Sequence, residues 1–584
     1  MGSVCSRKRE SGLTGSELRL GRSSRGISLR WQIRLPKDIE DEVCSINLQH
    51  PSLLKLSIEK LCQSIDNHAS LELLPRDLCQ HVLNELIRTQ LLSASTLKLF
   101  ANCALQDVLC GYYEGVEDSW LQVIGTQGSS LLALDIAGSL VTDNGLFYIK
   151  DCQNLRSLCL DYCDHVTDAG FSSLSDFTSL TTLSFKRSNL LTAEGMRCLA
   201  GLVNLTSLNL ERCQRIHGGL SYLKDLKGLE SLNLGWCNCI RNSDIKPLSG
   251  LVNLLELNFS RSKVNDFGVV FLKDMLKLEC LSMEGCPVTG ACMEIIAGLK
   301  SLTYLNVKSS GVSDSGCEKL SGLSNLKVLN IGYTSVTDAG IVFLDGSLQV
   351  DGYSRSGLVS LESLNLDSCQ VGDEGAQHFR GLTNLRHLDL SDCEIGNNGL
   401  NFLSGLKNLE SLSLSYSKVS DSGLRKLSGL TSLKCLNLDS RLITDVGLMA
   451  LTSLTELRNL DLFGARITDF GTASLKNFKK LQSLELCGGG ITDAGVKNLK
   501  DLTNMTSLNL SQNCNLTDQA LRYLSGMTKM VSLNIGNTRI TNAGLEHLAS
   551  MKNLNSLALK SCKVTLPALE RLQSCSLPNL IHIH

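Results

Sequence analysis

Cysteine is the residue type in this sequence with the most varied chemistry, because a thiolate can act as a nucleophile, a metal ligand or half of a disulfide. The 584 residues include 24 cysteines. Cys237 and Cys239 come closest to a metal-site spacing, but they lack a second pair of ligands. His582 and His584 make a weak ligand set of two. We therefore expect no metal site.

Patterns of known catalytic and nucleotide-binding sites are also missing. The sequence contains no G-x-x-x-x-G-K-[ST] loop, no H-E-x-x-H motif and no G-x-S-x-G turn. Lys and Arg number 56 against 58 Asp and Glu, a balance that argues against a globally basic nucleic-acid binder. We expect a protein that is not an enzyme and needs no cofactor.

The first residues could carry lipid. Met1 to Ser6 match the myristoylation pattern, with Gly2 as the acceptor, and Cys5 could accept palmitate. Residues 1–37 hold nine Lys and Arg against two Glu, which favours anionic membranes. We predict a disordered basic segment with a lipid anchor. A plain disordered tail or an organelle transit peptide remains open.

The cysteine content also bears on location. No apolar signal segment follows Met1, so we interpret the thiols as free and the compartment as reducing. The expected location is cytoplasmic, at the cytosolic face of the plasma membrane if the anchor forms.

A repeat governs about three-quarters of the chain. Its phrase is an aliphatic residue followed by Thr-Asp-x-Gly, as in Val166–Gly170. Eighteen copies follow one another at steps of 24 or 25 residues, with one step of 35. The aliphatic positions are 141, 166, 191, 216, 240, 264, 288, 312, 336, 371, 395, 419, 443, 467, 491, 516, 540 and 564.

A second pattern, L-x-x-L-x-L, precedes each phrase, as in Leu205–Leu210. Its alternating end predicts a short strand with two leucines facing inward. Thr-Asp then caps a helix. Because one strand–helix repeat cannot bury its apolar face alone, neighbours must stack. We predict parallel strands on a concave face and helices on a convex face.

The segment Leu160–Gly170 resembles the cysteine-containing, ribonuclease-inhibitor-like class of leucine-rich repeat proteins, common in plant proteins of the F-box/LRR type. The resemblance covers about residues 131–565. It implies an α/β solenoid, a horseshoe of about 18 strand–helix repeats. We assign residues 131–584 to it, with an insertion near 345–356 that we predict as an exposed loop.

The cysteine of the phrase recurs at one position in the repeat, where other copies have Ser or Thr. A small donor at this position predicts a buried ladder that bonds loop carbonyls of the adjoining repeat. The positions are Cys163, Cys213, Cys237, Cys286, Cys369, Cys393 and Cys562, with Ser188, Ser262, Ser310, Ser417, Thr334 and Thr538 as substitutes.

Residues 38–130 break the repeat. Apolar spacing predicts helices over 52–61, 74–87 and 94 to about 109, with Pro75 in a first helical turn. One interpretation is a cap over the open end of the first strand.

The other interpretation of residues 38–130 is a docking module. Leu74-Pro75-x-x-Leu78 resembles the start of an F-box, without its Trp-bearing second half. With the segment around Leu53 it also resembles a VHL-type box, in which Ser57 stands where Cys is usual. Both boxes imply docking to a cullin adaptor within residues 52–90. The candidates are Leu53, Leu61, Leu74, Pro75, Leu78 and Val82.

The concave face should present the ligand site. Asn recurs at the middle of the strand pattern, where it can form a structural ladder. The second position after the last strand leucine is aromatic or Arg in five consecutive repeats, and such residues are frequent hot spots. Parallel strands lie about 4.8 Å apart, so these five would span roughly 20 Å. The predicted contacts are Tyr162, Lys186, Arg187, Arg212, Trp236 and Arg261.

Later repeats place acidic residues on the same face: Asp367, Asp389, Asp392, Asp439, Asp461 and Glu485. This stripe opposes nucleic acid and would orient a polar partner. We predict a monomeric protein-binding chain. The F-box resemblance implies substrate recognition for a cullin-type ubiquitin ligase in ubiquitin-dependent protein catabolism. The alternative is a membrane-tethered scaffold or signalling adaptor without a ubiquitin role.

Overall fold

A computed structural model describes residues 52–345, 349–350, 353–354, 357–577 and 579–583. The chain divides into two compact units, Met1–Leu53 and Leu54–His584, and every strand of the sheet belongs to the second unit. Gly2, Cys5 and the basic segment lie outside the described residues.

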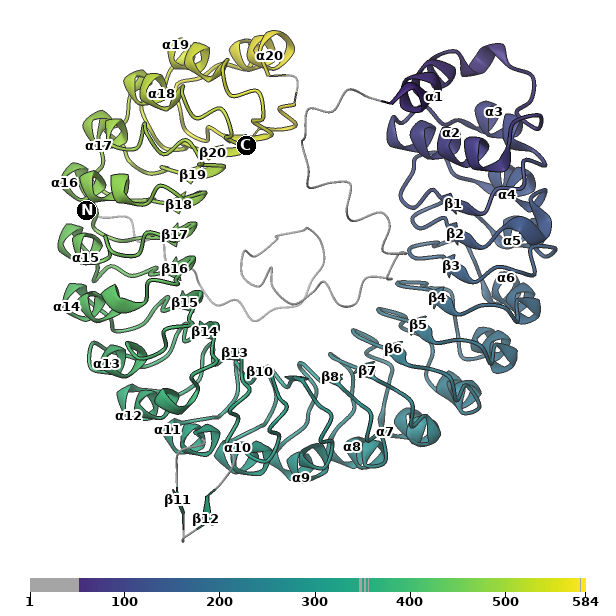
Figure 1. Ribbon diagram of the computed structural model, residues 1–584, viewed down its shortest axis with the longest axis horizontal. Helices are drawn as coiled ribbons and strands as arrows, with labels where there is room; N and C mark the ends of the chain where they lie inside the picture. Colours follow the sequence, from purple (N-terminus) through teal and green to yellow (C-terminus); the bar gives the residue numbers. More distant parts are fainter. Residues whose placement is uncertain (1–51, 346–348, 351–352, 355–356, 578, 584) are drawn as a thin grey trace. The chain divides into compact units, whose positions relative to one another are not determined.

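Twenty short strands form one parallel sheet in chain order (Figure 1). They line the inner side of the arc that this unit makes, and the helices line its outer side. Among the described residues no pairing joins β1 to β22, so the sheet is open. The strands are β1 (Asp107–Leu109), β2 (Ala133–Asp135), β3 (Ser157–Cys159), β4 (Thr182–Ser184), β5 (Ser207–Asn209), β6 (Ser231–Asn233), β7 (Glu256–Asn258), β8 (Cys280–Ser282), β9 (Tyr304–Asn306), β10 (Val328–Asn330), β13 (Ser363–Asn365), β14 (His387–Asp389), β15 (Ser411–Ser413), β16 (Cys435–Asn437), β17 (Asn459–Asp461), β18 (Ser483–Glu485), β19 (Ser507–Asn509), β20 (Ser532–Asn534), β21 (Ser556–Ala558) and β22 (His582–Ile583).

Helices of four to thirteen residues precede or follow the strands, and 3-10 turns replace them at Gly195–Gly201 and Gly219–Leu223. None of the described helices is long and apolar enough to cross a membrane. The helices are α1 (Leu53–Gln63), α2 (Arg76–Arg88), α3 (Ala94–Leu97), α4 (Asp118–Gly125), α5 (Asp143–Tyr148), α6 (Asp168–Ser172), α7 (Asn242–Ile245), α8 (Asp266–Val269), α9 (Met293–Ala297), α10 (Asp314–Leu320), α11 (Asp338–Ile341), α12 (Asp373–Ala376), α13 (Gly399–Leu403), α14 (Asp421–Leu424), α15 (Asp445–Ala450), α16 (Asp469–Thr472), α17 (Asp493–Lys497), α18 (Asp518–Leu524), α19 (Asn542–Leu545) and α20 (Leu566–Cys575).

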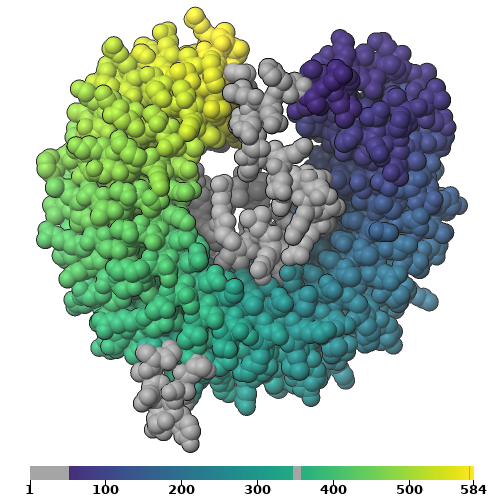
Figure 2. Space-filling model, in the orientation of Figure 1, coloured from purple at the N-terminus to yellow at the C-terminus, as the bar shows by residue number. Residues whose placement is uncertain are grey.

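The predicted horseshoe of strand–helix repeats is confirmed. Equivalent leucines pair in register across neighbouring strands, as Leu208 does with Leu232. They are buried in one core that runs through the whole unit. Figure 2 shows successive repeats packed side by side along the band. The core is therefore continuous, and each repeat contributes one layer to it.

The Thr-Asp-x-Gly phrase forms a bonding ladder on the helix side, which we call the Thr–Asp ladder. Asp143 Oδ1 accepts the backbone N–H of Thr167 at 2.7 Å, and its Oδ2 accepts the Thr167 hydroxyl at 2.6 Å. The Thr167 hydroxyl oxygen in turn caps α6. The same pair of bonds joins Asp118–Thr142, Asp143–Thr167, Asp168–Thr192, Asp266–Thr289, Asp314–Thr337, Asp421–Thr444, Asp445–Thr468, Asp469–Thr492, Asp493–Thr517 and Asp518–Thr541.

The glycine of the phrase is explained by the same carboxylate. A Cβ built on Gly170 would lie 2.3 Å from Asp143 Oδ1, and one on Gly471 would lie 2.1 Å from Asp445 Oδ1. Real side chains essentially never approach so closely, so glycine leaves room for this tight contact. Ala520 and Cys292 hold the same position in two repeats whose Asp–Thr bonds are kept, at 2.6–2.9 Å. Thr, Asp and Gly therefore act together across a repeat boundary.

The sheet begins earlier than residue 131, and the third predicted helix is wrong in its second half. Helix α3 ends at Leu97, and Asp107–Leu109 is strand β1, which pairs with β2. The repeat at residues 105–110 has Val108 and Cys110 where leucine is usual, which disguised it. Pro75 is the N-cap of α2 and does not lie in its first turn.

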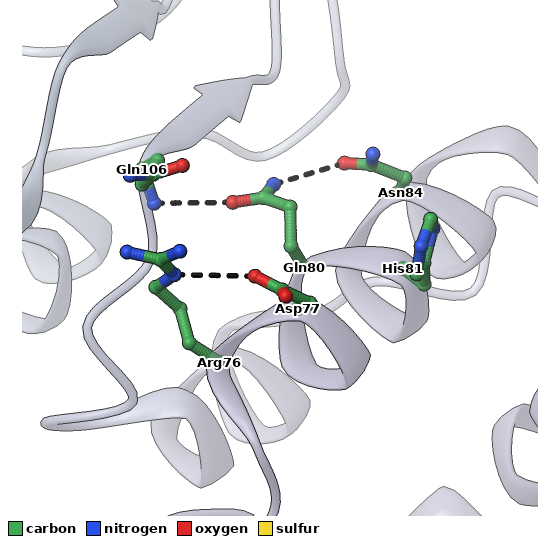
Figure 3. A pocket seen from close by; sticks show the side chains of 6 residues that line it. All are labelled: Arg76, Asp77, Gln80, His81, Asn84 and Gln106. Atoms are coloured by element: carbon green, nitrogen blue, oxygen red, sulfur yellow. Dashed lines mark hydrogen bonds and ion pairs between the residues drawn. The ribbon is translucent and has the colours of Figure 1, made fainter.

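A single side chain on α2 closes the outer edge of β1 (Figure 3). Gln80 Nε2 donates to the Asp107 carbonyl at 2.6 Å, and its Oε1 accepts the N–H groups of Gln106 and Asp107 at 3.1 Å each. This amide thus replaces a neighbouring strand at the edge. Helix α2 also buries Val82, Leu83 and other apolar residues in the common core. Helix α2 therefore covers the outer edge of β1.

The insertion near residues 345–356 differs from the predicted loop. Its described residues form an antiparallel pair, β11 (Gln349–Val350) with β12 (Tyr353–Ser354). The hairpin points away from the sheet on the helix side (Figure 1).

Candidate functional site

The recurrent cysteines form the predicted ladder. Cys237 Sγ donates to the Leu210 carbonyl at 3.0 Å, and Cys213 Sγ donates to the Phe185 carbonyl at 3.1 Å. The other five cysteines also bond a carbonyl of the preceding repeat, at 3.1–3.4 Å: Cys163, Cys286, Cys369, Cys393 and Cys562.

The Ser and Thr substitutes behave differently from the prediction. Ser310, Thr334 and Thr538 donate to a carbonyl of their own repeat at 2.6–2.7 Å. The hydroxyls of Ser188 and Ser417 have no hydrogen-bond partner. The hydroxyls of Ser262, Thr334 and Thr538 lie 3.4–3.6 Å from the cysteine thiol of the following repeat.

These thiols are poor nucleophiles. Burial raises the pKa of Cys213 and that of Cys393 to about 12. The Cys239 thiol donates to the Cys213 carbonyl at 3.5 Å, and burial raises its pKa as well. Among the described residues no three His, Cys, Asp or Glu are arranged to hold a metal ion. The structure assigns the cysteines to packing.

The five predicted aromatic and Arg contacts occupy one backbone position, in the turn just after each strand. Tyr162, Arg187, Arg212, Trp236 and Arg261 have φ between 58° and 63°, the left-handed region. Their N–H groups donate to a carbonyl of the next repeat at 2.6–2.8 Å. Left-handed backbone lets the chain turn out of the strand while the parallel hydrogen-bond ladder continues. These residues therefore line the edge of the sheet at the ends of the strands.

The same turn geometry recurs along the unit, and the side chains at it vary. Glycine, Asn and Asp adopt positive φ readily, whereas bulky residues there are outliers. Positive φ also occurs at the equivalent residues Tyr112, Gly138, Gly285, Ser309, Tyr333, Ser368, Asp392, Tyr416, Gly464, Gly488, Gln512, Asn537 and Ser561. Five consecutive bulky residues over 162–261 are the longest such run.

The bulky turn residues stack on one another. The Arg187 guanidinium lies 5.3 Å from the Tyr162 ring centre, and the Tyr162 ring lies 5.8 Å from that of Tyr112. Arg212 and Arg261 each lie 5.2 Å from the Trp236 ring centre, on neighbouring repeats. Cation–π contacts of this kind hold the guanidinium groups in place. We call Tyr112, Tyr162, Arg187, Arg212, Trp236 and Arg261 the turn array.

Two glycines make room for the turn array. A Cβ on Gly138 would lie 2.8 Å from Tyr112 Cδ1, and one on Gly285 would lie 2.7 Å from Arg261 Cδ. Glycine at these two turns lets a neighbouring large side chain lie across the backbone. Gly138 and Gly285 thus allow the large side chains of the turn array to pack against the backbone.

Carboxylates accompany several of the cations. Glu284 Oε1 accepts from Arg261 Nη2 at 3.1 Å. Glu211 Oε2 lies 3.1 Å from Lys186 Nζ, so the predicted contact Lys186 is already paired. Asp161 accepts the Lys186 N–H and the Ser184 hydroxyl, and burial raises the pKa of its carboxyl. The site therefore combines fixed cations, aromatic faces and paired acids.

Sequence reasoning missed Tyr112, which is 66% exposed. It lies 50 residues before Tyr162, two repeats earlier, in the copy whose leucines are replaced. The repeat spacing could have found it. The positive φ of the array could not be predicted from the sequence, because the aromatic and Arg residues at these positions disfavour that conformation.

The strand asparagines are structural. Asn233 Oδ1 accepts the Gly235 N–H at 3.0 Å and also a bond from Asn258 Nδ2 at 3.0 Å. This fixes the start of the turn and links neighbouring repeats. The bond to the N–H two residues on is made by Asn209, Asn233, Asn258, Asn306, Asn330, Asn365, Asn437, Asn509 and Asn534.

The acidic residues of the later repeats have different local roles. Asp389 and Asp461 accept the turn N–H that Asn accepts elsewhere. Asp367 pairs with Lys308 at 3.3 Å, while burial and the neighbouring Asp389 raise its pKa. Asp392 sits at a left-handed turn position.

The predicted adaptor-docking residues differ in burial. Val82 is buried, and Leu61 and Leu74 pack against the core. Leu78 is half-buried and Pro75 is exposed. Leu53 is 82% exposed.

Comparisons agree with the fold. The family model described as Leucine Rich repeat matches residues 298–321, 358–379, 381–404, 405–428 and 501–525. The matched segments are leucine-rich repeats, and the chain has the fold of a leucine-rich repeat solenoid. No curated protein matches its sequence.

Solved structures with similar repeats share little sequence with the chain. An internalin, inlF, of Listeria monocytogenes is 23% identical over 59% of this chain and 88% of its own, with a TM-score of 0.45. A leucine-rich repeat protein of Leptospira interrogans is 21% identical over 75% and 91%, with a TM-score of 0.37. The TLR13–ssRNA13 complex is 22% identical over 82% and 68%, with a TM-score of 0.46.

Proposed function

We propose that this leucine-rich repeat protein binds a target protein through its turn array. One observation carries the proposal: five consecutive repeats keep bulky side chains at a backbone position that favours glycine. Left-handed backbone costs such residues roughly 1–2 kcal/mol each, and strain of this kind collects at functional positions. Rigid aromatic and Arg side chains are also the commonest anchors of protein interfaces.

The test compares two variants at the same turn position. Trp236→Ala removes the centre of the array, and Gln512→Ala changes an exposed turn residue far from it. Both full-length variants and the wild type are used to capture proteins from the native cell, followed by mass spectrometry. We expect partners that Trp236→Ala loses at least tenfold and Gln512→Ala retains. Equal partner sets for all three would contradict the proposal.

A second proposal places the chain in a cullin-type ubiquitin ligase as the substrate receptor. It is supported by leucines exposed on and before the cap helices, where the F-box and VHL-box resemblance falls. Leu56 is 47% exposed and Leu73 is fully exposed. Apolar side chains in such places are typical of interaction surfaces.

Leu56→Asp with Leu73→Asp tests this role better than changes at Leu74 or Val82, which would disturb the core. We expect the double variant to lose a cullin and its adaptor while it keeps proteins held by the turn array. If the wild type recovers neither cullin nor adaptor but retains other partners, the scaffold or signalling adaptor becomes the function.

The membrane anchor and the location remain proposals. We propose that Gly2 is myristoylated, that Cys5 accepts palmitate, and that the chain faces the cytosol. The free thiols among the described residues are consistent with a reducing compartment. Labelling with an alkyne analogue of myristate should mark the wild type and leave Gly2→Ala unlabelled.

A further inference from the structure

The stack of the turn array is interrupted between Arg187 and Arg212. Arg187 leans on Tyr162 of the preceding repeat, and Arg212 leans on Trp236 of the following repeat. The two guanidinium groups belong to adjacent repeats, and their backbones are fixed by N–H bonds of 2.7 and 2.8 Å. Two rigidly held cations therefore flank a break in the stack.

Both guanidinium groups keep free donors. A guanidinium that lies over a ring uses its face, so the N–H groups at its edge still point outward. The nearest carboxylate contact of Arg212 is Nε to Glu211 Oε1 at 3.5 Å, too long for a good hydrogen bond. Among the described residues Arg187 has no carboxylate within ion-pair distance. Arg261, by contrast, is bonded to Glu284.

The charges around Arg187 and Arg212 limit which ligand group could bind between them. The site has a small positive excess, because it holds the cations Lys186, Arg187 and Arg212 and the acids Glu211 and Asp161. Glu211 is engaged by Lys186, and Asp161 by backbone and hydroxyl donors. A group with one negative charge gains two Arg partners at modest repulsion.

We propose that Arg187 and Arg212 together bind one carboxylate of the target polypeptide, with Tyr162 and Trp236 contacting the residues on either side of it. The inference rests on the proposed protein-binding function and specifies what the array recognises. Charge-assisted and bidentate hydrogen bonds make Arg the side chain best suited to this task. Two Arg side chains, each stacked on an aromatic ring, would select an acidic residue that has apolar neighbours in the target sequence.

The probes are three nine-residue peptide libraries, randomised except for a central Asp, Asn or phosphoserine. Each is passed over the immobilised full-length chain, and the retained peptides are quantified. The variants are Arg187→Gln with Arg212→Gln, and the control Arg215→Gln, an exposed cation outside the array. Thermal unfolding confirms that each variant folds.

We expect the wild type and Arg215→Gln to retain the Asp library at least tenfold more than the Asn library, and the double variant to lose this preference. Retained peptides should be enriched in aromatic or apolar neighbours. An Asp preference that survives in the double variant, a preference for phosphoserine over Asp, or no preference in the wild type overturns the inference.

Failure here is distinguishable from failure of the proposed function. If the double Arg variant captures the same cellular partners as the wild type while Trp236→Ala loses them, the array binds protein and the carboxylate assignment is wrong. If Trp236→Ala retains all partners, the protein-binding role of the array itself is wrong.

Discussion

The Thr–Asp ladder and the turn array lie at the two ends of the same strand-to-helix connections and obey different rules. On the ladder the side chains recur, because each one bonds or contacts the next repeat. At the turn only the backbone recurs, with positive φ at Tyr162, Gly464 and Asn537 alike. In the Thr–Asp ladder, stability therefore dictates which side chains are present. In the turn array, stability leaves the side chains free to vary with what the protein recognises.

The largest effect should come from crowding the Thr–Asp ladder. Gly471→Ala would place a methyl group 2.1 Å from Asp445 Oδ1, so the neighbouring backbone or carboxylate must shift. We expect the free energy of unfolding to fall by about 3 kcal/mol, as in overpacked cores. Urea denaturation measures the loss, and hydrogen exchange should localise it to the two repeats around α15 and α16.

Gly405→Ala is the matched control for that change. A Cβ at Gly405 would meet no atom within 4 Å, and its φ is not left-handed. We expect its stability to match or slightly exceed that of the wild type. Equal losses for both variants would mean that the glycines matter for some other reason than the Asp contact.

Removing the ladder carboxylate should cost less. Asp445→Ala deletes the bonds to the Thr468 N–H and hydroxyl, at 2.8 and 2.6 Å, and we expect a loss of about 1–2 kcal/mol in urea denaturation. Asp445→Asn should be nearly neutral, because Asn397 already bonds the Ser420 N–H and hydroxyl at the equivalent position. A large loss for Asn would show that charge, not bonding, holds the ladder.

The turn array should matter little to folding. Trp236→Ala removes two cation–π contacts, and we expect a decrease of about 1 kcal/mol in unfolding free energy. Tyr333→Ala removes one, from Lys308 at 4.7 Å, and should lose about half as much. Thermal unfolding compares them. A loss as large as that of Gly471→Ala would make the array a structural element.

The smallest effect should reverse sign between two turns. Gln512 has φ of 65°, so Gln512→Gly relieves strain and should stabilise the chain by about 0.5 kcal/mol. Ser440 occupies the equivalent turn without positive φ, and its hydroxyl accepts the Leu442 N–H at 3.2 Å. Ser440→Gly should therefore destabilise by about 0.5–1 kcal/mol. Urea midpoints of equal sign would contradict the backbone argument.

The sequence predicted the regular part of the fold well, because L-x-x-L-x-L and Thr-Asp-x-Gly are local patterns with clear periods. The predicted Thr cap is confirmed at Thr167. The partnership of Asp143 with Gly170 was not predicted, since it joins neighbouring repeats and appears only when they stack. Strand β1 was missed because Val108 and Cys110 replace its leucines.

The site was predicted less completely. Repeat spacing predicted Arg187, Arg212 and Trp236 at equivalent positions, and in the structure Arg187 stacks on Tyr162 while Arg212 stacks on Trp236. Which cations are already paired, such as Lys186 with Glu211, depends on side-chain reach across repeats. The left-handed backbone could not be predicted either, because local propensity argues against it for Trp and Arg.

The Gln80 amide has a consequence for how the array could lengthen over evolutionary time. It occupies the hydrogen-bonding groups that a further strand before β1 would need. A duplicated repeat can therefore not be added to the sheet before β1 and has to follow it. One glutamine thus occupies the groups through which another strand would pair at this edge, and growth of the sheet is left to repeats that follow β1.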